Sequence, residues 1–391
     1  MPEDMFRKKL SIGRRDFLRW SALAAGSFLV TPVLQACQRL GLIETSGTPT
    51  AVPVPIDDIP GAVSPTNPAS TATPVITIAP QISPTVAAGV APVALVRTRD
   101  RMEGTQRALS LLGQNPVSGK RVLLKPNFNS ADPAPASTHL DTFWALIEWL
   151  QRMGASGITV ADRSGMGDTR RVMEDLGAYA LAEKLGFDTL VFDELTEAGD
   201  WMLVQTEGDH WQNGFPVPRP LLEAEAVVQT CCLKPHRFGG HFTLSLKNSV
   251  GMVGKYMGGA DYNYMGELHA SPFQRLMIAE INAVYDPALI VLDGVEAFID
   301  DGPERGTKVW GEVILAGTDR VAVDAAGLAI LRSLGYSGIA ANGPIFAQEQ
   351  IARAVELGLG VDGVDKIDFI TDDLESAAYV DQIRELMRQS G

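Results

Sequence analysis

The chain has 391 residues, of which 46% are hydrophobic and 20% charged, a composition typical of a globular protein rather than of a disordered or fibrous one. Its formal net charge at pH 7 is −14. An acidic body repels the phosphates of nucleic acids and of anionic lipids, so we exclude nucleic acid and an anionic membrane surface as partners of the folded part.

Residues 1–36 have the pattern of an export signal. Arg14 and Arg15 lie in the segment GRRDFLR, which resembles the twin-arginine motif, and an apolar region runs from Trp20 to Val33. This region is about 14 residues long, shorter than the roughly 20 that span a bilayer as a helix. The pattern predicts export by the twin-arginine translocase.

The signal ends in the sequence LQAC, which resembles a lipoprotein processing box with Cys37 as the modified residue. Gln35 is unusual in such a box, and the alternative is that Cys37 is incidental and another peptidase cuts nearby. We expect lipid anchorage at Cys37. That would place the protein at the outer face of the cytoplasmic membrane or in the cell envelope.

Residues 37–92 are rich in Pro, Thr, Ser, Ala and Val. From Gln38 to Pro92 there is no aromatic residue, and the segment holds ten of the 24 prolines of the chain. Such a segment cannot bury a core, and its prolines keep it extended. We therefore interpret it as a linker between the anchor and a folded domain over residues 93–391.

Short apolar runs alternate with helical periodicity through the folded domain, which predicts βαβ units and a parallel sheet. We expect an α/β protein with a mostly parallel central sheet flanked by helices, as one large domain or two closely packed lobes. The expected strands are 94–96, 121–124, 157–161, 189–192, 201–206, 227–233, 289–292, 312–316 and 367–370. The expected helices are 103–112, 142–153, 170–176, 179–185, 272–285, 319–334, 345–357 and 376–387, with a further helix that carries Lys247.

Chemically active residue types concentrate between Val227 and Gly259. An apolar strand ends there in Lys234 and His236, and a helix with Lys247 and Asn248 follows beside several glycines. In open α/β sheets, ligands bind beyond the carboxyl ends of the strands. This stretch therefore predicts a ligand site at the sheet edge.

Other strands also end in polar residues, and in a parallel sheet these ends share one edge. We predict that they converge on one site, although a single charged strand end is more simply explained as a residue reaching the surface. The residues concerned are Lys125 and Asn127, Asp162, Lys234 and His236, and Asp293.

The lysines suit an anionic ligand. Lys234 and Lys247 could hold a carboxylate or phosphate, or act as bases if burial lowers their pKa values; the alternative is that they are solvated or paired with Asp. His236 could be an acid/base group or a metal ligand, or a structural loop residue. Asn248 either orients a ligand or satisfies backbone groups.

Carboxylates could complete a divalent metal site or neutralise the lysines. The candidate metal ligands are His236, His241 and Asp293, while a simple turn role is the alternative for Asp293. Asp324 lies in the apolar stripe of an expected helix and is a further candidate ligand-binding residue. We expect the remaining histidines and Asp300-Asp301 to lie at the surface: His139, His210 and His269.

Cysteine usage argues against a disulfide framework. Apart from Cys37 there is only the adjacent pair Cys231-Cys232, whose side chains would point to opposite faces of a strand. We interpret both as small apolar strand residues.

Several of these motifs resemble a bacterial and archaeal family named domain of unknown function 362. The matching segments are Lys234-Pro235-His236, Thr243 to Asn248, Gly251, Lys125-Pro126-Asn127, Asp293-Gly294, Gly302-Pro303 and Asp319 to Asp324, over roughly residues 121–334. The resemblance implies a shared site around these motifs but no established reaction. Many relatives carry a ferredoxin-like cysteine cluster that this sequence lacks, so an iron–sulfur cluster is not expected.

We predict an exported, lipid-tethered α/β protein that binds and acts on a small anionic metabolite at a Lys/His/Asp site, with a divalent metal as a candidate cofactor. The alternative is a non-catalytic lipoprotein that binds a ligand or scaffolds a complex. A third reading rests on His236, Gly239-Gly240 and Lys247, which are similar to a segment of the lactate racemase group and would imply a nickel-pincer nucleotide.

Overall fold

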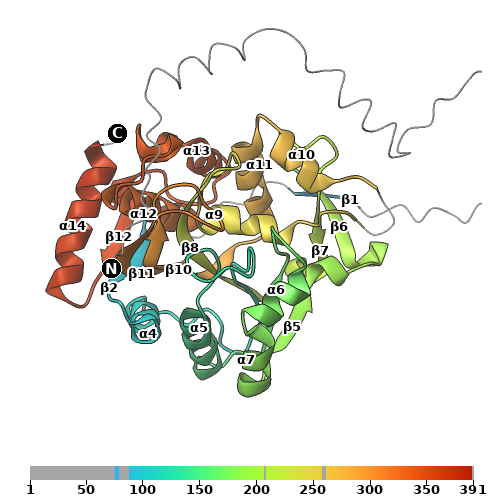
Figure 1. Cartoon of the computed structure of the whole chain (residues 1–391), viewed down its shortest axis with the longest axis horizontal. Helices are drawn as coiled ribbons and strands as arrows, with labels where there is room; N and C mark the ends of the chain where they lie inside the picture. Colours follow the sequence, from blue (N-terminus) through green and yellow to red (C-terminus); the bar gives the residue numbers. More distant parts are fainter. Residues whose placement is uncertain (1–74, 79–87, 207, 258–260, 390–391) are drawn as a thin grey trace, which may run out of the picture. The chain divides into compact units, whose positions relative to one another are not determined.

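A large β-sheet organises the chain (Figure 1), and the computed structural model describes residues 75–78, 88–206, 208–257 and 261–389. The twin-arginine motif and Cys37 lie outside the described residues. Within them, nine strands form the sheet. Their order across it is β12 (Ile367–Ile370), β2 (Ala91–Arg97), β11 (Lys308–Gly317), β10 (Pro287–Phe298), β8 (Ala226–His236), β3 (Arg121–Lys125), β4 (Gly157–Asp162) and β5 (Asp188–Val191), while β9 (His241–Thr243) pairs with β8.

The sheet is mostly parallel, as predicted. Strands β10, β8, β3, β4 and β5 pair in parallel, as do β12 and β2, whereas β11 runs antiparallel to both of its neighbours. The carboxyl ends of β8, β3 and β4 therefore meet at one edge. This is the edge where sequence reasoning placed the ligand site.

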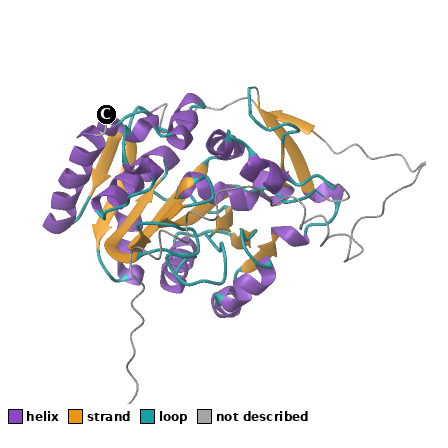
Figure 2. Ribbon diagram, turned by 45° about the horizontal axis from the view of Figure 1, so that its top comes forward, coloured by secondary structure: helices purple, strands orange, loops and turns teal. Residues whose placement is uncertain are grey.

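Helices cover both faces of the sheet (Figures 1 and 2). One face packs against α4 (Arg101–Leu111), α5 (Leu140–Arg152), α6 (Thr169–Asp175) and α7 (Ala178–Leu185). The other packs against α9 (Ser245–Asn248), α12 (Arg320–Ser333), α13 (Glu349–Glu356) and α14 (Leu374–Gln389). Strand β8 is buried along its whole length because both faces are covered, which explains its continuous apolar run.

A third apolar cluster lies beneath a smaller sheet. Strands β1 (Val75–Ile78), β6 (Trp201–Thr206) and β7 (Phe215–Pro218) form this sheet in that order. It packs with α8 (Arg219–Leu222), α10 (Tyr264–Ala270) and α11 (Gln274–Ile281). β1 lies inside the segment that we expected to be a plain linker. Its β-branched run pairs in parallel with β6, so this part of the predicted linker belongs to the folded unit.

The strand that carries Asp293 is longer than predicted. We expected it to end at Leu292, but β10 continues to Phe298 because it pairs with β11 as far as the Phe298 and Lys308 register. Asp293 consequently lies within the strand and not at its end. The expected helix over 272–285 is also shorter, since α11 ends at Ile281 and a 3₁₀ turn over Asn282–Val284 follows.

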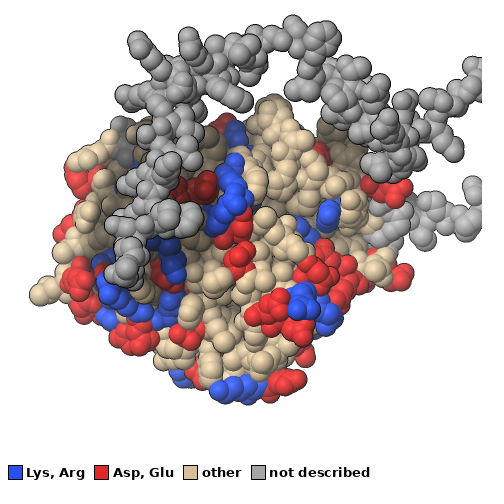
Figure 3. Space-filling model, viewed as in Figure 1, with Lys and Arg blue, Asp and Glu red and all other residues tan. Residues whose placement is uncertain are grey.

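Charged side chains of both signs lie side by side on the surface seen in Figure 3. The exposed ion pairs of the described residues include Arg170 with Glu194 and Arg171 with Asp175. None of the described helices is both long and apolar enough to cross a membrane.

Candidate functional site

A cavity of about 1270 Å³ opens at the carboxyl ends of β3, β4 and β8. Its wall includes residues from the loops after these strands, from α9 and from the region of α10 and α11. Six of the predicted site residues line it: Lys125, Asn127, Asp162, His236, Lys247 and Asn248. The sheet edge therefore brings together most of the residues selected from the sequence.

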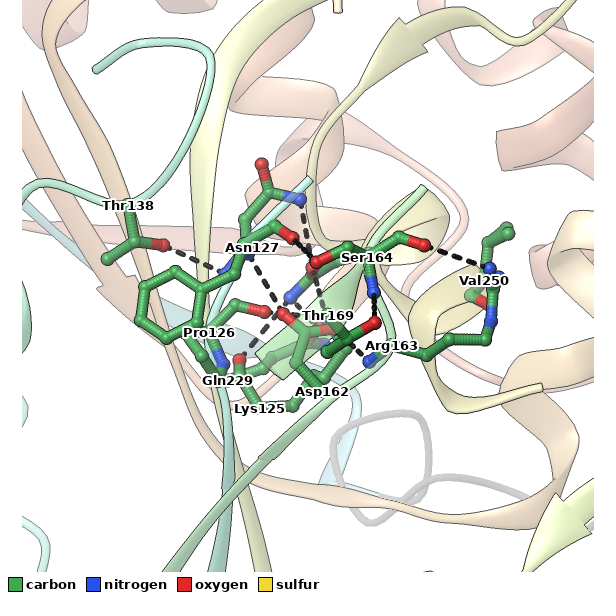
Figure 4. A network of polar contacts seen from close by, with 12 residues as sticks. Lys125, Pro126, Asn127, Thr138, Asp162, Arg163, Ser164, Thr169, Gln229 and Val250 are labelled. Atoms are coloured by element: carbon green, nitrogen blue, oxygen red, sulfur yellow. Dashed lines mark hydrogen bonds and ion pairs between the residues drawn. The ribbon is translucent and has the colours of Figure 1, made fainter. Parts of the chain in front are cut away.

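Lys125 and Asp162 form a buried ion pair at one side of the cavity (Figure 4). Lys125 Nζ lies 2.7 Å from Asp162 Oδ1, and both side chains are 2% or less exposed. Lys125 Nζ also donates to the carbonyl of Pro126 at 2.6 Å and to Asn248 Oδ1 at 3.1 Å. Burial lowers the pKa of Lys125, although the Asp162 carboxylate opposes that shift. This lysine is thus held by protein groups on several sides.

Asn248, the last residue of α9, links this helix to β3 and β8. Its side-chain oxygen accepts from Lys125 Nζ and, at 3.2 Å, from Asn127 Nδ2. Its amide nitrogen donates to Gln229 Oε1 and to the carbonyl of Thr230, each at 3.2 Å. These bonds fix the short helix against β8, so Asn248 satisfies a backbone carbonyl; it also lines the cavity, where orientation of a ligand stays a prediction.

Lys234 lies behind the cavity and is fully buried. Its ammonium donates to Asn127 Oδ1 at 2.7 Å and to the carbonyl of Ala136. Burial lowers its pKa to about 8. Because its donors are directed at the loop after β3, Lys234 supports Asn127 and does not present a free ammonium to a ligand.

Asp324 caps α9 from the neighbouring helix α12. Its carboxylate accepts from the backbone nitrogens of Ser245 at 2.8 Å and Leu246 at 3.1 Å, and from the Ser245 hydroxyl. Burial raises its pKa to about 7, against the effect of these hydrogen bonds. Asp324 is not among the residues that line the cavity. It positions Lys247 through the helix, which differs from the ligand-binding role that we predicted.

Lys247 lines the cavity without a polar partner among the described residues. It is 7% exposed and lines the cavity, and no hydrogen bond or ion pair of its ammonium occurs among the described residues. Burial lowers its pKa to about 7, and the positive charges of Lys234 and Arg163 lower it further. A buried lysine without a counter-ion is costly, so the site is suited to receive an anion.

His236 lies next to Lys247 and also lacks a partner. It is 7% exposed, and its Nδ1 is buried without a hydrogen-bond partner in the described part of the chain. Burial lowers the pKa of His236 well below its usual value, and the charges of Lys247 and Lys234 contribute to the shift. The imidazole is therefore neutral at pH 7 and can accept a proton or a hydrogen bond.

Glycines allow the backbone to pass close to the two lysines of the cavity. A Cβ atom on Gly240 would lie 2.5 Å from Lys247 Cε and 3.1 Å from His236 Nδ1. A Cβ atom on Gly251 would lie 2.7 Å from both Lys125 Nζ and Asp162 Oδ1. The glycine-rich pattern of this stretch thus reflects close packing around the site.

Some cavity residues were missed by sequence reasoning. Arg163 donates to the carbonyls of Val250 and Val253, each at 2.8 Å, and joins the loop after β4 to the segment after α9. His269 is exposed, as expected, but it also lines the cavity from α10, and its Nδ1 lies 2.7 Å from the carbonyl of Met265. The sequence around His269 carries no motif that places it near β8.

The three predicted metal ligands do not all come together. Asp293 Oδ2 accepts from Arg101 Nε at 2.9 Å and from the Thr142 hydroxyl at 2.7 Å, on the face covered by α4 and α5. His241 is the cross-strand partner of His236, and both line a smaller adjoining cavity of about 230 Å³, so only Asp293 lies apart from the other two. Among the described residues, no three His, Cys, Asp or Glu side chains are grouped as a metal ion would require.

The other two histidines that we expected at the surface, His139 and His210, are half-buried and make specific contacts. His210 is partly buried, and its Nδ1 lies 2.7 Å from Oε1 of the buried Glu280. His139 caps α5, since its Nδ1 accepts from the backbone nitrogen of Asp141 at 3.1 Å. Cys231 and Cys232 are buried free thiols, as predicted.

Comparisons with curated proteins, with solved structures and with family models each found a match. The curated thylakoid-associated protein sll1697 of Synechocystis sp. is 26% identical over 215 residues, which cover 53% of this chain and 61% of the relative. The chain thus matches about three fifths of the length of that relative. The solved structure of the lactate racemase apoprotein from Thermoanaerobacterium thermosaccharolyticum is 18% identical and covers 54% of this chain and 51% of its own, with a TM-score of 0.35. That score is too low to indicate a shared fold or reaction.

The third match is the family model described as domain of unknown function (DUF362). It spans residues 122–329, more than half of the chain, and this segment contains Lys125, Asp162, His236 and Lys247 of the cavity wall. The chain therefore belongs to the DUF362 family.

Proposed function

We propose that this protein binds a small anionic organic molecule in the cavity and moves a proton on it. The observation that carries the proposal is Lys247, a buried lysine in the cavity wall with no partner among the described residues. A bound carboxylate or phosphate would supply the missing counter-charge, in the way that charge-assisted hydrogen bonds do elsewhere. Lys125 is less suited to this role, because Asp162 already neutralises it.

His236 is the proton acceptor in this proposal. In the empty site its pKa lies well below the usual value, partly because of the Lys247 charge. An anion on Lys247 would offset that charge and make the imidazole more basic when substrate is present. The proton would pass from the substrate to His236 and return to the substrate from the same ring. His269, on the opposite segment of the wall, is a second imidazole within reach of the cavity.

Hydrogen exchange tests the proposal without a known substrate. The protein is incubated in D2O with a panel of small 2-hydroxy, 2-oxo and 2-amino acids, and deuterium incorporation is followed by NMR. We expect at least one acid to exchange, His236→Gln to abolish exchange but keep binding, and Lys247→Met to abolish both. Binding that depends on Lys247, with no exchange in any acid, would instead favour a non-catalytic ligand-binding lipoprotein.

We also propose that the protein is exported by the twin-arginine translocase and lipid-anchored at Cys37. The support is the sequence around Arg14, Arg15 and Cys37. Mass spectrometry of the mature N-terminus tests this: a diacylglyceryl group on Cys37 is expected, and paired Arg14→Lys and Arg15→Lys changes should keep the precursor in the cytoplasm. An unmodified N-terminus beyond Cys37 would contradict the anchor.

A further inference from the structure

The cavity is larger than one small anion needs. Its volume of about 1270 Å³ exceeds the range of about 300–1,000 Å³ common for pockets that hold drug-sized ligands. Lys247 and His236 occupy only its buried part. A ligand that fills the cavity would therefore have a second part that contacts the rest of the wall.

Exposed apolar side chains gather around this cavity. In the described part of the chain, Phe238 and Met166 are 46% and 37% exposed and line it. Tyr256 and Phe273, which are 47% and 49% exposed, each neighbour lining residues in sequence. Ile339, at 77%, lines the smaller adjoining cavity, which shares His236, Arg237 and Gly239 with the large one.

Exposed apolar surface on a soluble domain usually marks a binding site. Here the two polar groups of the proposed anion site lie deeper than two apolar residues of the wall, although the exposed Lys255 and Asp168 also line the cavity. The partnerless Lys247 and His236 are each 7% exposed, whereas Phe238 and Met166 are several times more exposed. The charged end of a ligand would therefore lie inside, and an apolar portion would extend toward the opening.

The composition of the apolar wall suits a flexible chain. Met166 and Met265 both line the cavity, and thioether side chains adapt to irregular apolar shapes. Phe238 is fixed by neighbours on two sides, since its ring lies under the Arg237 guanidinium and edge-on to His236. Met265 is buried and its sulfur accepts from Arg163 at 3.1 Å, so Phe238 and Met166 are the exposed apolar side chains of this wall that an alkyl chain can cover.

We propose that the ligand of this cavity is an anionic amphiphile, with its acid group at Lys247 and its apolar chain along Phe238 and Met166. This inference rests on the proposed function, because it assigns the charged end to the same lysine. It adds the second half of the ligand, which a small polar acid would lack.

A series of n-alkyl phosphates from ethyl to octyl, used below their micelle concentrations, tests the inference by calorimetry. For the unaltered protein, affinity should rise by about fourfold for each methylene that becomes buried. The double variant Phe238→Ser, Met166→Ser should weaken octyl phosphate by about tenfold or more and leave ethyl phosphate unchanged. Trp310→Ser, which changes an aromatic residue that is 52% exposed and lines neither cavity, is the matched control.

The outcomes separate this inference from the proposed function. Lys247→Met should weaken every member of the series by the same factor. A flat series that still depends on Lys247 would refute the amphiphile and leave the anion site standing. A rising series that is indifferent to Lys247→Met would refute both. If the double variant changes only the association with phosphatidylcholine vesicles, the apolar residues are a membrane contact and the inference fails.

Discussion

Replacing Lys247 with methionine should stabilise the fold while it removes anion binding. The native pKa of Lys247 is lowered from 10.5 to about 7. The difference of about 3.5 units corresponds to about 5 kcal/mol of unfolding free energy, at about 1.4 kcal/mol per unit. Methionine fills a similar volume without a charge, so Lys247→Met should recover a large part of this cost.

The stability that Lys247→Met gains over the unaltered protein should decrease as the pH rises. Below about pH 7, Lys247 is charged in both the folded and the unfolded states, and its burial penalty is complete. Between about pH 7 and 10.5 the unfolded chain binds the proton and the folded one does not, so raising the pH stabilises the native protein. The advantage of Lys247→Met should therefore shrink by about 1.4 kcal/mol per pH unit across this window and vanish above it.

Urea unfolding of the ligand-free protein at a series of pH values measures this effect. Lys120→Met, a change of the same type at an exposed residue, is the control and should alter the unfolding free energy by about 0.5 kcal/mol or less. A destabilised Lys247→Met variant at neutral pH would refute the reasoning. So would a gain that stays constant as the pH rises.

Three further predictions follow from the same geometry. Gly240→Ala should displace Lys247 and weaken anion binding by tenfold or more, which is about 1.4 kcal/mol or more. Gly157→Ala, where an added Cβ meets nothing within 4 Å, is the control and should leave anion binding unchanged. Equal titration curves for the two variants would contradict the close contact between Gly240 and Lys247. Asp324→Ala should destabilise the protein by about 1–2 kcal/mol, because α9 loses its cap, and should weaken anion binding. Asp324→Asn should have a smaller effect on both stability and binding. Thermal melts measure the stability and calorimetry measures the binding. The affinity for benzoate should be constant between about pH 5 and 7, where its carboxylate is ionised, and fall about tenfold per pH unit above pH 7, because only the charged lysine binds. A flat calorimetric profile would exclude Lys247 as the charge partner.

The convergence of Lys125, Asp162 and His236 could be predicted because each follows a short apolar run that parallel pairing aligns at one edge. Asp293 follows the same rule in the sequence but lies elsewhere. Pairing between β10 and β11 extends that strand to Phe298, and the strength of such long-range pairing is not visible in a local apolar run. Lys234 also looked equivalent to Lys247, yet the loop after β3 buries it and occupies its donors.

Three other residues of the cavity wall could not be predicted. His269 reaches it from α10, a helix of seven residues without strong periodicity, and Phe238 and Met166 lie in turns whose side-chain directions depend on tertiary packing. β1 carried a readable signal, since Val75-Ile76-Thr77-Ile78 is a β-branched run within a proline-rich segment. We nevertheless assigned these four residues to the linker, because the residues around them are rich in proline.

The central claim is that Lys247 is a buried lysine, without a counter-ion among the described residues, that binds an anion. NMR of the side-chain nitrogens of ¹⁵N-lysine-labelled protein, with Lys247→Met to assign the resonance, measures its pKa directly. The account predicts a pKa near 7 in the free protein and a clear rise when octyl phosphate is added. A pKa near the usual 10.5 that does not respond to any anion would contradict it.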